Sequence, residues 1–110
     1  MPFHIKVVLP SVTHDGRPIS KPIRAAAVQT VKAALSDAAG GCTTHDGKGS
    51  WIHPITGVQD EDVSVIESYS KRPFDPRVIE MMVRAVLTDL HQHTAAVVMN
   101  DIMYHYSDND

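Results

Sequence analysis

The residues best suited to chemistry gather in one stretch of the chain, between positions 43 and 53. It reads Thr-Thr-His-Asp-Gly-Lys-Gly-Ser-Trp-Ile-His, which places hydroxyls, imidazoles, an ammonium and an indole close together. Hydroxyls and imidazoles hydrogen-bond polar ligands, an ammonium attracts anions, and an indole offers a flat face for stacking. This composition is typical of a site for a small anionic or nucleotide-like ligand. The predicted ligand-binding residues are Arg24, Thr43, Thr44, His45, Lys48, Ser50, Trp51, His53 and Tyr104.

The run Asp46-Gly-Lys-Gly-Ser50 invites comparison with a phosphate-binding loop. It lacks the Gly-x-x-x-x-Gly-Lys-[Ser/Thr] spacing and no helical pattern follows it, so the sequence does not indicate a nucleoside triphosphatase. Two interpretations stay open. Backbone N–H groups beside the two glycines could line an anion site, or the segment is a bulged strand with solvated side chains.

Trp51 and Ile52 are adjacent in a predicted strand, so their side chains point to opposite faces of the sheet. If Trp51 lies on the face away from the helices, it forms an aromatic platform with Tyr104 or Tyr106 for a flat ligand or a partner protomer. If it lies under the helices, it is part of the core. The sequence does not decide between the two.

Histidine and cysteine are the remaining candidates for catalysis or metal binding. His45 or His53 could act as an acid or base, or join His4 or His105 across the sheet, but no metal-binding motif such as His-Glu-x-x-His or Cys-x-x-Cys is present. Cys42 follows a predicted helix C-terminus, where the helix dipole opposes a thiolate, so we expect a small buried residue there. We expect neither a metal nor a cofactor.

The composition of the whole chain limits the classes of protein to which it can belong. With 110 residues, 43% of them hydrophobic and 21% charged, it is expected to form one α+β domain over residues 1–110, with frayed ends at 1–2 and 107–110. A formal net charge of −3 argues against a general nucleic-acid binder, which needs a basic face. One cysteine and no long apolar run favour a cytoplasmic protein without a membrane span.

Around the chemically rich stretch, the hydrophobic patterns predict the elements that must position it. Alternation over residues 3–9 predicts a strand, and a 3.6-residue period over residues 22–38 predicts a helix that ends at Gly40-Gly41. Residues 40–70 read as a β-hairpin with an irregular first strand and a turn at Pro54–Gly57. A second helix is predicted from Asp75 to about His93, and a last strand over residues 95–106.

The element order strand, helix, strand, strand, helix, strand predicts a ferredoxin-like βαββαβ plait, a four-stranded antiparallel sheet with both helices on one face. The opposite face of the sheet then stays uncovered. Val8, one of Val65 and Ile66, and part of residues 97–103 are apolar side chains left for it. An open sheet face of this kind binds a ligand or another chain, so we expect a homo-oligomer.

The hairpin also resembles that of small bacterial and phage plait domains of unassigned activity. The shared residues are Gly-Gly-Cys-Thr at 40–43, Gly-Ser-Trp at 49–51, Gly57, and Glu61 before an apolar strand. In those domains an aromatic residue stands where this chain has Cys42. The resemblance implies the plait fold and brings no catalytic residues with it.

Three functions fit these features. The first is a non-catalytic oligomer, like a phage protein that sequesters a signalling nucleotide, with its ligand held by the 43–53 strand. The second is a protein–protein interaction or regulatory module that uses the open sheet face. The third is a small enzyme resembling dimeric plait monooxygenases and isomerases, with His45 or His53 as acid or base.

Overall fold

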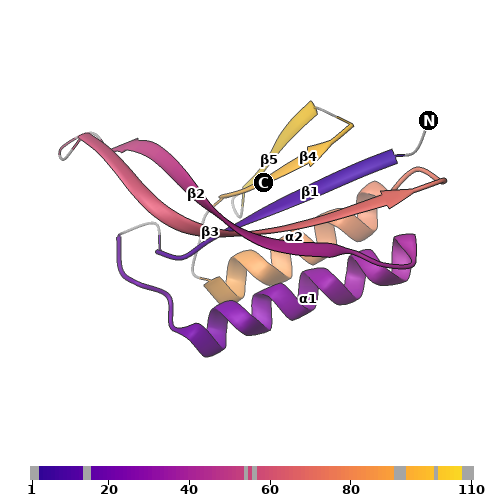
Figure 1. Ribbon diagram of the computed structural model, residues 1–110, viewed down its shortest axis with the longest axis horizontal. Helices are drawn as coiled ribbons and strands as arrows, with labels where there is room; N and C mark the ends of the chain where they lie inside the picture. Colours follow the sequence, from indigo (N-terminus) through magenta and orange to yellow (C-terminus); the bar gives the residue numbers. More distant parts are fainter. Residues whose placement is uncertain are drawn as a thin grey trace.

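The structure is a computed structural model that describes residues 3–13, 16–53, 55, 57–90, 94–100 and 102–107, without the side chains of 51, 53, 94–96 and 102–107. Five strands and two helices follow one another along the described residues (Figure 1). Their bounds are β1 Phe3–Pro10, α1 Lys21–Ala39, β2 Thr43–His53, β3 Gly57–Ser70, α2 Pro76–Leu90, β4 Thr94–Met99 and β5 Ile102–Ser107.

The strands form one antiparallel sheet in the order β2-β3-β1-β4-β5. The first four positions in this order are those of the ferredoxin-like plait, so the predicted fold class is confirmed. The difference lies at the C-terminus, where the expected single strand is two. Asn100, with a left-handed φ of 49°, lies in the turn between β4 and β5, and asparagine is one of the few residues that tolerate this conformation.

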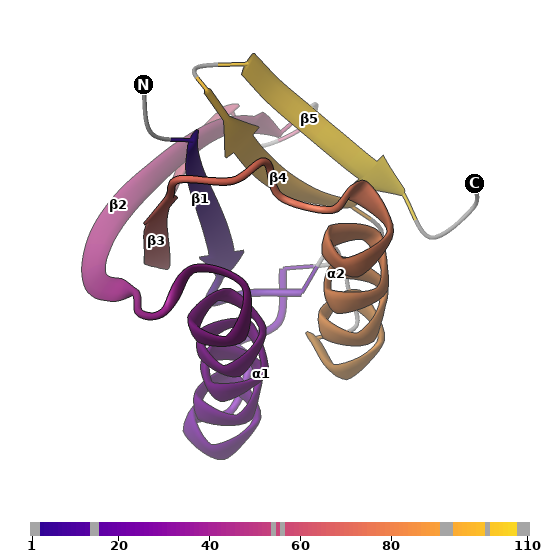
Figure 2. The ribbon, with the colours of Figure 1, turned by 90° about the vertical axis from the view of Figure 1, so that its right-hand side faces the viewer.

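The helices α1 and α2 lie side by side beneath one face of the sheet (Figure 2). α1 has Ser20 at its N-cap and Gly40 at its C-cap with φ of 86°, as the glycine pair predicts. α2 begins after Asp75, whose Oδ1 accepts a hydrogen bond from the Arg77 N–H at 2.9 Å, the expected N-cap contact. Ser20 and Gly40 therefore bound α1, and Asp75 marks the start of α2.

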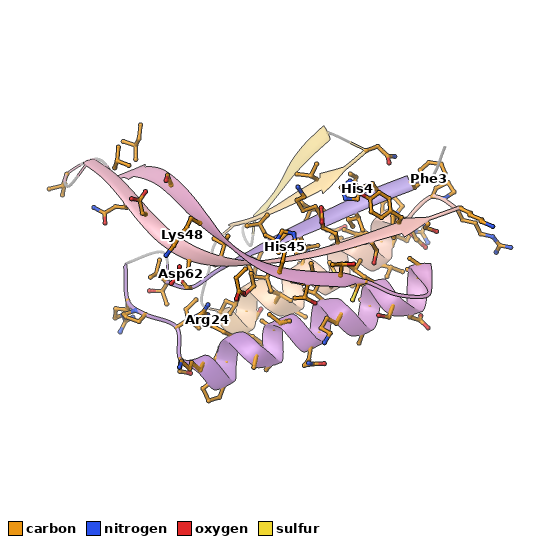
Figure 3. The ribbon with its side chains drawn as sticks, in the orientation of Figure 1. Phe3, His4, Arg24, His45, Lys48 and Asp62 are labelled. Atoms are coloured by element: carbon orange, nitrogen blue, oxygen red, sulfur yellow. The ribbon has the colours of Figure 1, made fainter. Side chains whose placement is uncertain are left out.

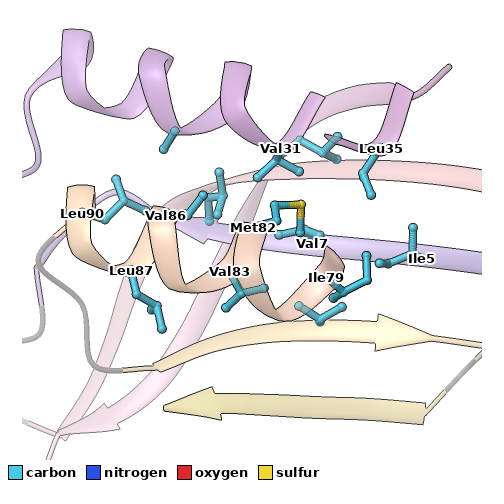
Figure 4. Packing of buried hydrophobic residues seen from close by; sticks show 14 of the residues in the cluster. Ile5, Val7, Val31, Leu35, Ile79, Met82, Val83, Val86, Leu87 and Leu90 are labelled. Atoms are coloured by element: carbon cyan, nitrogen blue, oxygen red, sulfur yellow. The ribbon is translucent and has the colours of Figure 1, made fainter. Parts of the chain in front are cut away.

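The core fills the space between the helices and the covered face of the sheet (Figure 4). Alternate residues of β1 point into it, which confirms the predicted half-buried strand. Its fully buried members include Ile5 and Val7 from β1, Ile66 from β3 and Leu35 from α1. Beside it, the Ser68 hydroxyl donates to the Gly41 carbonyl at 2.6 Å and so ties the connection after α1 to β3.

The β2–β3 hairpin is longer than the sheet that it joins. Its register is unbroken from Thr43 opposite Glu67 to His53 opposite Gly57, so β2 is a regular strand and the predicted irregularity is wrong. Gly57 has the positive φ expected of it, 83°, whereas Pro54 and Thr56 lie outside the described residues. β1 pairs with β3 only as far as Val63, and beyond that point the hairpin is a two-stranded ribbon. We call residues 48–53 and 57–62 the arm.

None of the helices formed by the described residues is long and apolar enough to cross a membrane.

Candidate functional site

The best candidate site lies on the open sheet face, around the carboxylate of Glu67. Glu67 stands on β3 between Lys6 of β1 and Thr43 of β2. Its Oε1 lies 3.2 Å from the His4 Nε2 and 3.5 Å from the Lys6 Nζ, and its Oε2 lies 3.3 Å from the His45 Nε2. Three strands thus bring two imidazoles and an ammonium to one carboxylate. With Tyr69, these residues form what we call the open-face cluster.

His4 is held in place by backbone and ring contacts. Its N–H donates to the Asn100 Oδ1 at 2.9 Å, and its carbonyl accepts from the Asn100 N–H at 2.9 Å. Its ring stacks on Tyr69, the residue directly opposite in the sheet, with the ring centroids 4.5 Å apart and the planes 15° from parallel. The β4–β5 turn therefore fixes the strand that carries His4, and Tyr69 fixes the ring.

The electrostatics of the cluster keep Glu67 ionised. Its side chain is 21% exposed, and this partial burial acts to raise its pKa. The hydrogen bonds with His45 and His4 and the charge of Lys6 act in the opposite direction. Their combined effect is larger, so the pKa of Glu67 lies below its ordinary value of 4.5. A carboxylate with a lowered pKa is a poor proton acceptor at neutral pH and a good hydrogen-bond acceptor.

The arrangement can therefore recognise a ligand that is flat at one end and polar at the other. Tyr69 is largely exposed although one face of its ring stacks on His4, and an exposed aromatic ring is a surface on which a purine can stack. Glu67 can accept hydrogen bonds from hydroxyl or ammonium groups next to that surface. An aromatic ring beside a carboxylate offers stacking and hydrogen-bond acceptance, whereas the site predicted from the sequence relied on cationic and hydroxyl groups.

The structure divides the sequence-predicted site residues between the two faces of the sheet (Figure 3). Thr43 and His45 pair with Glu67 and Val65, at positions that alternate with the core-facing Ile66, and so belong to the open face. Thr44 pairs with Ile66, and Lys48 and Ser50 follow it on the helix side.

Arg24 lies on α1, where it lines a shallow hollow of about 340 Å³ with Lys21, Ala25, Val28, Gln29 and Ser64. The sheet therefore separates these residues into two groups.

Lys48 and Ser50 are also engaged by carboxylates. The Lys48 ammonium forms an ion pair with Asp62, and the Ser50 hydroxyl donates to the Asp60 Oδ1 at 2.6 Å. Both acidic residues lie within β3, directly opposite their partners in β2. The Asp62 carboxylate raises the pKa of Lys48 and already balances its charge. Contact of Lys48 with a ligand stays a prediction.

The two glycines of β2 differ in how closely Val63 packs against them. A Cβ at Gly49 would lie 3.2 Å from the Val63 Cγ1, and one at Gly47 would lie 3.5 Å from the Val63 Cγ2. The contact at Gly49 is tighter than an ordinary van der Waals distance and gives that glycine a packing reason, whereas the contact at Gly47 is ordinary. Cys42 packs against the edge of the core. The Ser36 hydroxyl donates a hydrogen bond to the Cys42 Sγ at 3.6 Å.

The remaining predicted residues are only partly described. Trp51 pairs with Gln59, His53 with Gly57, and Tyr104 with Val97, which places their backbones in the sheet. Their side chains are not described by the structure. Both alternatives for Trp51, on the open face or under the helices, therefore remain predictions. In the described part of the chain, no group of three histidine, cysteine or acidic side chains is arranged to hold a metal ion.

Sequence reasoning missed Lys6, Glu67 and Tyr69 as site residues and considered His4 only as a metal ligand. The signal was present in β1, where His4 and Lys6 occupy the polar face of an alternating strand. Glu67 and Tyr69 alternate in the same way on β3. What the sequence lacked was the register that sets Tyr69 opposite His4 and Glu67 opposite Lys6.

With this geometry established, two solved structures are informative. One is a phage SAM lyase in complex with S-methyl-5'-thioadenosine, with a TM-score of 0.69, 11% sequence identity, and coverage of 98% of this chain and 91% of that chain. The other is a phage SAM lyase in the apo state, with a TM-score of 0.65, 9% identity, and coverage of 98% and 90%. No family model matches the sequence, and no curated protein sequence matches it. At these identities the likeness establishes a shared fold.

Proposed function

We propose that this chain binds a thioether or sulfonium nucleoside, the class of S-methyl-5'-thioadenosine and SAM, on its open sheet face, and that it cleaves SAM. The observation that carries the proposal is the match to a phage SAM lyase in complex with S-methyl-5'-thioadenosine, which covers 98% of this chain and 91% of the lyase. A match of this extent leaves little of either chain outside the common fold. It favours a shared ligand class over a chance likeness of two plaits.

The open-face cluster supports the same ligand class from the chemistry of its side chains. Tyr69, backed by the stacked ring of His4, supplies an exposed aromatic ring for adenine, and Glu67 supplies an acceptor for the ribose hydroxyls or for the ammonium of SAM. Thr43 and His45 lie beside Glu67 on the same face. Trp51, His53 and Tyr104 remain candidates for further contacts.

The reaction needs little from the protein beyond binding and orientation. Release of S-methyl-5'-thioadenosine breaks the bond between the sulfonium sulfur and the aminobutyrate chain, and the bonding electrons stay on sulfur, which becomes neutral. The carboxylate of SAM itself can form the new C–O bond at the carbon that sulfur leaves, which gives a lactone and requires no co-reactant. Because the pKa of Glu67 is lowered, we assign it to ligand binding and not to proton abstraction.

This proposal refines the functions expected from the sequence. The nucleotide-like ligand is retained, while turnover replaces sequestration because the structural neighbour is a lyase. A cytoplasmic location remains part of the proposal, since a single cysteine needs no oxidising compartment.

The test is to incubate the purified protein with SAM and to follow S-methyl-5'-thioadenosine and the amino-acid product by chromatography. We expect S-methyl-5'-thioadenosine to accumulate, and Glu67→Gln to lower kcat/KM about tenfold or more, because a hydrogen bond to a charged group is lost. Asp37→Asn, which changes an exposed carboxylate of α1 to an amide on the opposite side of the sheet, is the matched control and should leave kcat/KM unchanged. Absence of both product formation and binding of S-methyl-5'-thioadenosine would contradict the proposal.

A further inference from the structure

The arm exposes apolar side chains to solvent. Ile52 and Val58 stand directly opposite each other near its end and are 78% and 70% exposed, and Ile55 beyond them is also exposed. In Figure 1 the arm extends to the upper left, beyond the ends of β1 and β4. These side chains therefore lie away from the core of their own chain.

A two-stranded ribbon with exposed apolar side chains is stabilised when another surface packs against it. Two strands without a third are at best marginally stable in water, and paired β-branched residues contribute most when another surface buries them. Within the arm, the Lys48–Asp62 ion pair and the Ser50–Asp60 hydrogen bond are polar contacts that link the two strands. An apolar surface that packs against Ile52 and Val58 would add the missing burial.

The outer face of α2 offers such a surface. Val78 and Met81 lie about one turn apart on the helix and are exposed, Met81 to 72%, while Ile79, Met82 and Val83 fill the core on the other side. Methionine is flexible and adapts to a partner's shape, and it is frequent at binding surfaces. We call Arg77, Val78 and Met81 the α2 patch.

The charges of the two surfaces are complementary. Between residues 48 and 62 the arm carries Lys48 against Asp60, Glu61 and Asp62, a net charge of −2. Residues 71–84, which lead into and include the α2 patch, carry four basic and two acidic residues, a net charge of +2. Opposite potentials around apolar centres guide two surfaces together and set their register.

The two surfaces lie at opposite ends of the molecule, because β3 runs from the arm to the connection that precedes α2 (Figure 1). One copy can therefore use its arm and its α2 patch at the same time. We infer that the arm of one copy docks on the α2 patch of a second copy of this chain. Contacts of this head-to-tail type close into a ring or continue as a filament.

Two variants test the inference by sedimentation velocity. Ile52→Asp removes the arm contact and Met81→Asp removes the α2 contact, and both positions are exposed enough for the fold to survive, which circular dichroism checks. We expect the unaltered chain to be oligomeric, and each variant alone to be monomeric. Ile23→Asp, on the exposed surface of α1, is the control and should leave the oligomer intact.

Mixing the two variants is the decisive step. A head-to-tail contact predicts that the mixture forms a heterodimer, since the intact arm of the Met81→Asp chain still fits the intact α2 patch of the Ile52→Asp chain. Raising the salt concentration should weaken this heterodimer, because opposite charges flank the contact. A monomeric unaltered chain, an oligomer that survives Met81→Asp, or a mixture that stays monomeric would each overturn the inference.

Discussion

The two halves of the β2–β3 hairpin share one continuous register and differ in what surrounds them. Near Glu67 the hairpin has β1 beside it and the helices beneath it, and the β3 residues Val63, Val65, Ile66 and Ser68 are buried. In the arm the same two strands continue past Val63, the last β3 residue that pairs with β1, and Ile52 and Val58 are exposed. Strand pairing is thus the same in both halves, and the third strand determines which half can build a core and a site.

The largest expected contrast is between Ile66 and Ile52, the same residue type in the two halves. Ile66→Ala removes a fully buried side chain and should lower the free energy of unfolding by about 2–5 kcal/mol. Ile52→Ala removes an exposed one and should change it by less than about 0.5 kcal/mol. Urea denaturation measures both, and equal losses would show that the arm is packed in solution.

The next largest effect is the dependence of stability on pH that Glu67 causes. Because the pKa of Glu67 is lower in the folded chain, its stabilising contribution is fully present above its ordinary value of 4.5 and is lost as the pH falls through the folded value. The unaltered chain should therefore lose more stability between pH 7 and pH 3 than Glu67→Gln does. Denaturation midpoints across that range measure the difference, and parallel profiles would contradict the cluster geometry.

A smaller contrast separates the two glycines of β2. Alanine at Gly47 meets Val63 at an ordinary contact distance and reduces the entropy of the unfolded chain, so Gly47→Ala should be neutral or slightly stabilising. Alanine at Gly49 meets Val63 at 3.2 Å and requires that side chain to move. We expect Gly49→Ala to be less stable than Gly47→Ala by about 1 kcal/mol, measured by urea denaturation.

The smallest expected effect is that of the ion pair in the arm. Lys48 and Asp62 are both exposed, and solvent screens pairs of this kind. Lys48→Ala should shift the thermal midpoint by no more than the error of the measurement. A clear loss of stability would mean that the arm is more buried in solution than its structure indicates, as docking on another copy would cause.

Much of the fold could be predicted because the relevant patterns are local. Alternation in β1, the stripes of α1 and α2, Gly40 as C-cap and Asp75 as N-cap all act within a few residues. The element order then leaves few ways to arrange the sheet. The β4–β5 turn was missed because residues 95–106 read as a single apolar run, in which only Asn100 marks the turn.

The candidate site was less predictable because it depends on register between strands far apart in the chain. His4 meets Glu67 across 63 positions of sequence, and nothing local indicates that pairing. Lys48 and Ser50 stand near Thr43 and His45 in sequence, but the first two lie on the helix side of the sheet and the last two on the open face. Because successive residues of a strand face opposite sides of the sheet, residues that are close in sequence can belong to different surfaces.

The most direct test of the account is to map where S-methyl-5'-thioadenosine binds by titrating it into ¹⁵N-labelled protein and following the amide resonances. Binding at the open-face cluster predicts the largest chemical-shift changes at His4, Lys6, His45, Glu67 and Tyr69, and changes near zero at Lys21 and Arg24. Changes confined to the hollow beside α1, or none at any ligand concentration, would contradict the assignment of function to the open face.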